Sequence, residues 1–235
     1  MRVEVDYRQF RLNRLNSEPF RHLKLLLFWP VFGLLFLFVE RFRPVEQYYA
    51  VHCALDDMIP FCEYFLIPYL LWFVVLVGII LYTLLFDVKA FRKFMWFVMI
   101  TYSVTILIYL LFPTCQNLRP TEFVRDNVFT HILAWFYTFD TNTNVCPSIH
   151  VIGSVAVMCT AWDAKGLARM PWRIAVTILT VLICLSTVFL KQHSAVDVLA
   201  AVPLCIIAYH LVFVRQTVPV GRRPDKRKER IENSV

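Results

Sequence analysis

The chain has 235 residues, of which 59% are hydrophobic and 17% are charged, and its formal net charge is +7. Soluble domains contain about 45–50% apolar residues, so this composition, with a mean hydropathy of +0.59, predicts an integral membrane protein. The basic excess fits the rule that lysine and arginine gather in cytoplasmic segments beside spanning helices. We therefore expect no nucleic-acid partner.

Six apolar stretches are long enough, or nearly so, to cross a bilayer. A spanning helix needs about 20 mostly apolar residues, and continuous runs of this kind must be helical because each backbone polar group needs a partner within the segment. The predicted fold class is all-α, a polytopic bundle of six transmembrane helices. The stretches cover residues 22–39, 65–86, 94–113, 148–163, 172–190 and 194–214.

The basic residues predict the orientation of this bundle. They are concentrated in an N-terminal arm over 1–21, in the second and fourth connections, and in a tail over 215–235. We therefore expect a single membrane domain over 22–214 with both termini in the cytoplasm. The first apolar run lacks a small-residue cleavage signal, so it is expected to remain as a helix.

Four of the seven cysteines fall on the predicted outer side. Cys53 could pair with Cys62, and Cys115 with Cys146, as disulfides. Sequence alone does not fix connectivity, so free thiols are an equal alternative.

The segment over 121–139 predicts an amphipathic helix at the outer membrane interface, before the fourth span. An apolar stripe at helical spacing contains Val124, Val128, Ile132, Trp135, Phe136 and Phe139, and Asp126, Asn127, Thr130 and His131 lie opposite. Such a helix could form a wall past which a lipid enters, or it could be only an anchored connector.

The stretch KQHSAVD begins the sixth apolar run and places His193 and Asp197 four residues apart. On a helix these two residues share a face. The carboxylate can hold one imidazole nitrogen as N–H and leave the other with a free lone pair, ready to act as a nucleophile or base. The alternative is a pair that only caps the helix.

The stretch PSIH begins the fourth run and offers a second set of polar groups. Pro147 suits the first turn of a helix, where free N–H groups bind anions and the Ser148 hydroxyl could add a donor. His150 would lie one turn inside, although it could equally be a polar residue lining the bundle. Arg119, just after the third run, carries a guanidinium that fits phosphate.

These groups occur at one membrane level and in an order that resembles the type-2 phosphatidic acid phosphatase superfamily. The resemblance covers roughly residues 60–214. The matching residues are Arg119 and Pro120 at the end of the first motif, Pro147, Ser148 and His150 in the second, and Ser186, His193 and Asp197 in the third.

Two positions depart from the family pattern. Phe112 stands where the first motif has lysine, and Thr187 stands where the third has arginine. With Asp140 and Asn144 ahead of PSIH as supporting residues, the pattern is more similar to the branch that contains inositol phosphorylceramide synthase. Lys191 could supply a replacement charge.

The resemblance implies a lipid phosphoesterase that needs no metal and no cofactor. His193 would attack phosphorus, Asp197 would orient it, and His150 would act as general acid and base. Arg119, Ser148 and Lys191 would bind the phosphate, and the active site would face the extracytoplasmic or lumenal side.

The two missing cations favour a phosphodiester, with one negative charge, over a monoester with nearly two. We therefore expect transfer of a phospho-head group from a membrane lipid substrate to an alcohol or lipid acceptor. The alternative is hydrolysis of a lipid phosphate or pyrophosphate. A non-enzymatic transporter or scaffold, and a haem or metal protein using His150 and His193, are the remaining classes, and the oligomeric state is open.

Overall fold

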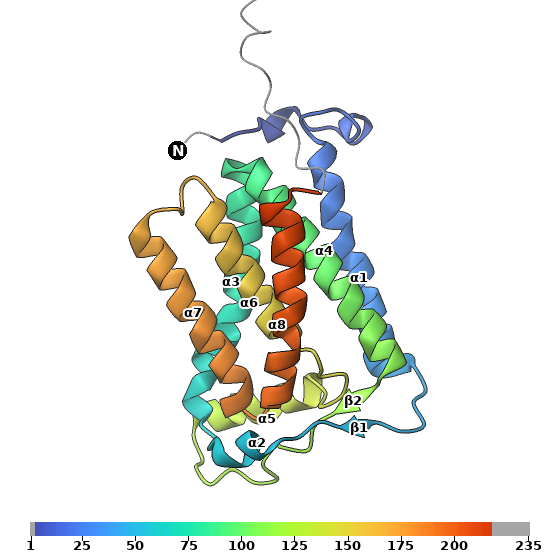
Figure 1. Ribbon diagram of the computed structural model, residues 1–235, viewed down its shortest axis with the longest axis vertical. Coiled ribbons are helices and arrows are strands. Elements are labelled where there is room, and N and C mark those ends of the chain that lie inside the picture. The colour runs from blue at the N-terminus through green and yellow to red at the C-terminus, as the bar shows by residue number, and fades with distance from the viewer. Residues whose placement is uncertain (1–2, 218–235) are drawn as a thin grey trace, which may run out of the picture.

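The computed structural model describes residues 3–217, which form a helix bundle with two short strands at one end (Figure 1). The α-helices are α1 (Phe28–Leu37), α2 (Ala54–Met58), α3 (Leu66–Phe86), α4 (Val88–Leu111), α5 (Val128–Phe139), α6 (Ile149–Asp163), α7 (Met170–Phe189) and α8 (Ala195–Tyr209). Strands β1 (Tyr49–Ala50) and β2 (Thr114–Cys115) pair in parallel.

Tighter and wider turns extend several of these helices. The 3₁₀ segments are η1 (Tyr7–Gln9), η2 (Leu12–Arg14), η3 (Arg21–Leu27) and η5 (Glu63–Phe65), and the π-helical segments are η4 (Phe38–Phe42) and η6 (His210–Val214). Because η3 and η4 continue α1 at its two ends, the first apolar helix runs without a break from 21 to 42.

Five helices in the described part of the chain are long and apolar enough to cross a membrane. They are Arg21–Phe42, Glu63–Phe86, Val88–Leu111, Met170–Phe189 and Ala195–Val214. The fourth predicted span corresponds to α6, which has 15 residues. At 1.5 Å per residue this helix is about 22 Å long, shorter than the roughly 30 Å hydrocarbon core. The all-α multi-pass fold is confirmed, and a sixth full-length span is not.

Helix α6 lies in the middle of the bundle, where it contacts α3, α4, α7 and α8 (Figure 1). Small residues allow this close packing. A Cβ atom at Gly153 would lie 2.7 Å from the Tyr102 hydroxyl and 3.0 Å from Nε1 of Trp72. Most residues of α6 are therefore buried by protein, whereas α3 presents leucine and valine side chains outward.

The N-terminal arm packs on the turn between α3 and α4, at the end of the bundle away from the strands (Figure 1). The Tyr7 hydroxyl donates to the carbonyl oxygen of Leu84 at 2.7 Å, and Glu4 N–H donates to that of Leu85 at 2.9 Å. Helix η6 also ends at this end of the bundle. The described part of the chain therefore begins and ends at the same end of the bundle, in agreement with the expected topology, whose cytoplasmic assignment stays a prediction. Most of the basic tail lies outside the described residues.

Helix α5 differs from the amphipathic helix expected over 121–139. It starts at Val128 because the Asn127 side chain accepts hydrogen bonds from the N–H groups of Phe129 and Thr130 and so caps it. Its buried face contains Thr130, Leu133 and Phe136. Of the predicted apolar stripe, Val128, Ile132 and Trp135 are exposed, and Val124 precedes the helix. An interfacial position for α5 stays a prediction.

All seven cysteines are free thiols in this structure. The two disulfides that the sequence allowed, between Cys53 and Cys62 and between Cys115 and Cys146, are therefore not formed here, and the free-thiol alternative describes the structure.

Candidate active site

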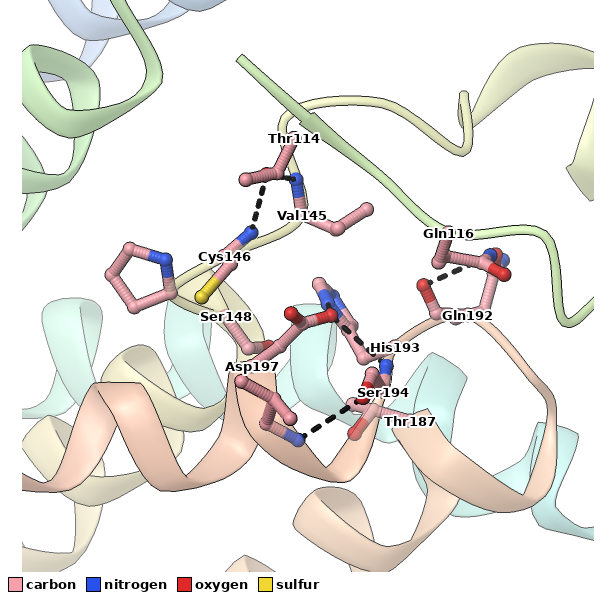
Figure 2. A network of polar contacts seen from close by, with 12 residues as sticks. Thr114, Gln116, Val145, Cys146, Ser148, Thr187, Gln192, His193, Ser194 and Asp197 are labelled. Atoms are coloured by element: carbon pink, nitrogen blue, oxygen red, sulfur yellow. Dashed lines mark hydrogen bonds and ion pairs between the residues drawn. The ribbon is translucent and has the colours of Figure 1, made fainter. Parts of the chain in front are cut away.

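His193 and Asp197 form a buried pair at the start of α8 (Figure 2). The His193 Nδ1 atom lies 3.1 Å from Oδ2 of Asp197, and the same oxygen accepts a hydrogen bond from Ser194 N–H at 2.9 Å. A carboxylate can only accept, so Nδ1 carries the proton and Nε2 keeps its lone pair. This is the arrangement that a nucleophilic or basic imidazole requires.

The capping and orienting roles of Asp197 coexist. Ser194 is the N-cap of α8, and its side chain and that of Asp197 form a reciprocal capping box. The capping carboxylate is the same one that holds His193. The helix start therefore fixes the imidazole direction, because both depend on one buried group.

The PSIH stretch is joined directly to this helix start. Ser148 is the N-cap of α6, and its backbone N–H donates to the carbonyl oxygen of Asp197 at 3.1 Å. Its hydroxyl oxygen accepts from Val151 N–H at 3.5 Å. Pro147 follows a cis peptide bond and precedes the cap, so it is not in the first helical turn as expected. The hydroxyl that was predicted to bind an anion is buried and caps α6, and its role in phosphate binding stays a prediction.

His150 faces His193 across a narrow gap. The centroids of the two rings are 5.6 Å apart, with an angle of 64° between their planes. The His150 ring stacks on Tyr69 at 4.7 Å and packs beside Trp72 at 4.4 Å. Its Nδ1 atom is buried and has no hydrogen-bond partner. Helix α3 thus fixes the plane of one imidazole while α8 fixes the other.

A small pocket of about 20 Å³ lies between the two histidines and the loop before α6. Its polar lining residues are Glu40, Asp140, Thr141, Thr143, Asn144, His150, Gln192 and His193, and its apolar ones are Phe36, Tyr109, Val145 and Ile149. Among the residues that the structure describes, this wall contains two carboxylates and neither lysine nor arginine. The predicted phosphate ligands, Arg119, Ser148 and Lys191, are not among these lining residues.

Arg119 lies behind the pocket wall. Its guanidinium donates to the carbonyl oxygens of Tyr137, Asp140 and Thr141 and to Oε1 of Gln192. It also packs 4.4 Å from the centre of the Tyr137 ring. Burial lowers the pKa of Arg119 from its usual value. The fork expected to hold phosphate is thus occupied by the chain itself, and it positions Gln192.

Lys191 is likewise turned away from the histidines. Its Nζ atom donates to the carbonyl oxygens of Asp56 at 2.7 Å and Ile59 at 2.5 Å. Its backbone has a positive φ of 54°, in the turn between α7 and α8. In this arrangement the ammonium binds the C-terminal end of α2, so a contact with phosphate requires those two bonds to be exchanged.

Asp140 and Asn144, expected as supporting residues, both line the pocket. Asp140 Oδ2 accepts a hydrogen bond from the Tyr69 hydroxyl at 2.9 Å. Burial raises the pKa of Asp140, and the Tyr69 bond and the nearby Arg119 oppose that rise. The Asn144 side chain donates to Oε1 of Glu40 at 2.8 Å.

The structure adds Glu40, Gln192 and Asp56, besides Thr141 and Thr143, to the polar residues that the sequence singled out. Glu40 and Gln192 line the pocket, and Asp56 accepts hydrogen bonds from the Ser194 hydroxyl and Ala195 N–H. Glu40 could have been suspected as an acidic residue at the end of an apolar run. Gln192 precedes a motif histidine, but nothing in the sequence around Asp56 indicates its partner.

Comparison with protein families finds one relationship. A family model described as the PAP2 superfamily matches residues 35–211, which is more than half of the chain. The protein therefore belongs to the PAP2 superfamily, which supports a phosphatase-type or phosphotransferase-type enzyme acting at a membrane. No curated protein and no solved structure matches the chain.

Proposed function

We propose that the protein is a lipid phosphoesterase that works through a phosphohistidine on His193. One observation carries the proposal: His193 has Nδ1 bound to Asp197 and Nε2 free, and a second imidazole, His150, lies 5.6 Å away between ring centroids. One ring is oriented for attack on phosphorus, and the other is near enough to serve the departing and arriving oxygens. Membership of the PAP2 superfamily supports the same chemistry.

Two balanced steps describe the reaction. The lone pair of His193 Nε2 forms a bond to phosphorus, the bond from phosphorus to the leaving oxygen breaks, and His150 gives that oxygen a proton. An acceptor hydroxyl oxygen then attacks phosphorus, its proton passes to His150, and the electron pair of the P–N bond returns to Nε2. Asp197 stabilises the cationic imidazole. Proton transfer of this kind contributes typically about 10²–10⁴-fold to the rate.

Charge favours transfer of a phospho-head group over release of phosphate. Phe112 is exposed at the end of α4, and the hydroxyl of buried Thr187 donates to the Cys184 carbonyl oxygen. Neither residue supplies the cation that the family pattern has there. A phosphodiester brings one negative charge to this pocket and a monoester nearly two, and each unpaired charge is costly in a water-poor site. This favours the sphingolipid-synthase-like branch.

Hydrolysis of a lipid phosphate or pyrophosphate is the second candidate. The pocket between the histidines has a volume of about 20 Å³, which is room for about one water molecule. Water is the smallest acceptor that can take the place of the alcohol in the second step. The two histidines serve either acceptor.

The test is the purified protein in liposomes. One set of vesicles carries a phosphodiester lipid with candidate alcohol or lipid acceptors, and the others carry phosphatidic acid or a lipid pyrophosphate. The proposal expects a product that forms only when an acceptor is present. Faster release of inorganic phosphate from the monoester or pyrophosphate, with no acceptor-dependent product, would replace transfer by hydrolysis. Absence of any phosphohistidine would reject both.

A further inference from the structure

The hydrogen bonds around the pocket leave one acceptor and one donor without partners. The Asn144 amide faces Glu40 with its NH₂ group, at 2.8 Å, because a carboxylate can only accept. Its Oδ1 atom must therefore point the other way, and it has no partner although the residue is 3% exposed. A buried acceptor without a donor is costly, so it indicates a missing ligand group.

Gln192 supplies the free donor by the same reasoning. Arg119 can only donate, so Gln192 presents Oε1 to it and directs its NH₂ group elsewhere. The Nε2 atom has no partner, and the residue is 2% exposed. Both free groups belong to side chains that line the pocket containing the two histidines.

Two carboxylates add to the acceptor side of this pocket. Glu40, from the π-helical turn η4, accepts hydrogen bonds from Thr141, Thr143 and Asn144. A carboxylate offers about four lone-pair sites, so one remains. Asp140 forms the second carboxylate, beside Glu40 in the same lining. An ionised phosphate has no hydrogen to give to any of these oxygens.

Some lining residues of the pocket therefore offer free hydrogen-bond acceptors, and Gln192 offers a free donor. We infer that Asn144, Glu40 and Asp140 form a subsite for a hydroxyl group carried by the head group on phosphorus, while Gln192 donates to a phosphate oxygen. The subsite binds and moves no proton, since His150 does that. This inference rests on the proposed function and specifies the class of head group it acts on.

A hydroxyl group has the hydrogen that the free acceptors of this subsite need. Three neutral donors already bind Glu40, and the positive charges of Arg119 and Arg41 act on Asp140. What remains is a neutral amide oxygen and a spare lone pair, which match an O–H donor.

The experiment compares two lipids that differ by hydroxyl groups on a three-carbon head group. Phosphatidylglycerol and phosphatidylpropanol are presented to the full-length protein in liposomes, with phosphatidylethanolamine as the cationic comparison. We expect kcat/KM to be about tenfold or more higher for the glycerol head group, because the propyl group leaves the buried acceptors unpaired. Preference for the ethanolamine head group, or equal rates for glycerol and propanol, would overturn the inference.

Two variants test the residues. Asn144→Gly removes the free acceptor while glycine tolerates the positive φ of 51° found there, and Glu40→Gln removes the charge while keeping the shape. Both should bring the ratio of kcat/KM for the glycerol lipid to that for the propanol lipid close to one. Glu46→Gln, in an exposed position of the loop after η4, is the control and should keep the preference.

The outcomes separate this inference from the proposed function. If phosphatidylpropanol is turned over through a phosphohistidine but the variants keep the full glycerol preference, the subsite is wrong and the function stands. If no lipid forms a phosphohistidine with the wild-type protein, the proposed function fails first, and this assignment fails with it.

Discussion

Lys191 and Asp56 hold the segment around His193 from both sides. The Lys191 ammonium donates to the backbone carbonyl oxygen of Asp56 at 2.7 Å. The Asp56 carboxylate accepts from the Ser194 hydroxyl at 2.6 Å and from Ala195 N–H at 2.7 Å. The residues before and after His193 are therefore bound to one short helix, α2, more than 130 positions away in the chain.

These contacts predict that Lys191 supports catalysis by holding the segment around His193 in place, and that it does not bind phosphate. Lys191→Met should lower kcat by about tenfold or more, since two hydrogen bonds from a charged group are lost, while KM for the lipid changes by less than about threefold. Lys191→Arg should restore part of the rate. Steady-state kinetics in liposomes measure both constants. A large rise in KM with unchanged kcat would instead assign Lys191 to direct phosphate binding.

Asp56 should make stability depend on pH in the acid range. Burial raises the pKa of this carboxyl, but hydrogen bonds from Ser194, Ala195 and Cys53 together bring it below its ordinary value of 3.8. The folded state thus favours the ionised form. The stabilisation is complete at pH values above about 4 and is lost as the pH falls through the folded pKa.

The matching variant is Asp56→Asn, measured by thermal unfolding in detergent. At pH 7 it should be less stable than the wild type by about 1–3 kcal/mol, because a buried network loses its charged acceptor. The difference should shrink near pH 3. Asp57→Asn changes an adjacent, exposed carboxylate and should have little effect at either pH. A constant difference across this range would contradict the role given to ionised Asp56.

Gln192 should determine binding of the phosphate group. Gln192→Glu keeps an acceptor for Arg119 but replaces the free NH₂ donor by an oxygen that repels an anion. We expect KM for the lipid to rise by about tenfold or more, since hydrogen bonds to charged groups contribute about 1.5–3 kcal/mol. Thermal stability should stay near the wild-type value. Unchanged KM would show that phosphate is bound elsewhere.

Variants of the two histidines should block the reaction at different steps. His193→Ala should abolish turnover and labelling, whereas His150→Ala should accumulate an acid-labile phosphoenzyme from a substrate with a good leaving group. Labelled phosphate on denatured protein, before and after acid treatment, distinguishes these outcomes. Chelators should leave the wild-type rate intact. Loss of activity in EDTA, with recovery on adding a divalent metal, would count against the histidine mechanism.

Topology can be checked with engineered thiols in a cysteine-free background. Gln47→Cys lies beyond η4 at the end of the bundle with the site, and Arg14→Cys lies in the arm at the other end. An impermeant thiol reagent added to intact cells should label position 47 and spare position 14. The reverse pattern would place the active site on the cytoplasmic side and the substrate in the inner leaflet.

The helices were predictable because their signal is local. A run of about 20 apolar residues can satisfy its backbone in a bilayer only as a helix, and the observed α3, α7 and α8 agree with three of the predicted stretches within a few residues. The prediction was weaker for α6. The sequence shows an apolar run there, but only the packing around Gly153 and its neighbours places this shorter helix in the centre.

The pairing of His193 with Asp197 was also predictable from their spacing in the sequence. Residues four apart at a helix start share a face, and His193 and Asp197 meet as that rule requires. The ring of His150 lies beside them, as the common membrane level of the motifs suggested. The residue types and their order along the chain therefore determined which groups meet.

Only the tertiary structure decided where the cations and carboxylates point. Arg119 and Lys191 lie near His193 in the fold, yet carbonyl oxygens from distant segments take their hydrogen bonds. Glu40 reaches the pocket from the first helix and meets a loop about 100 residues further along the chain. A side chain's free donors depend on which buried acceptors surround it, and those acceptors are brought together by packing between segments remote in sequence.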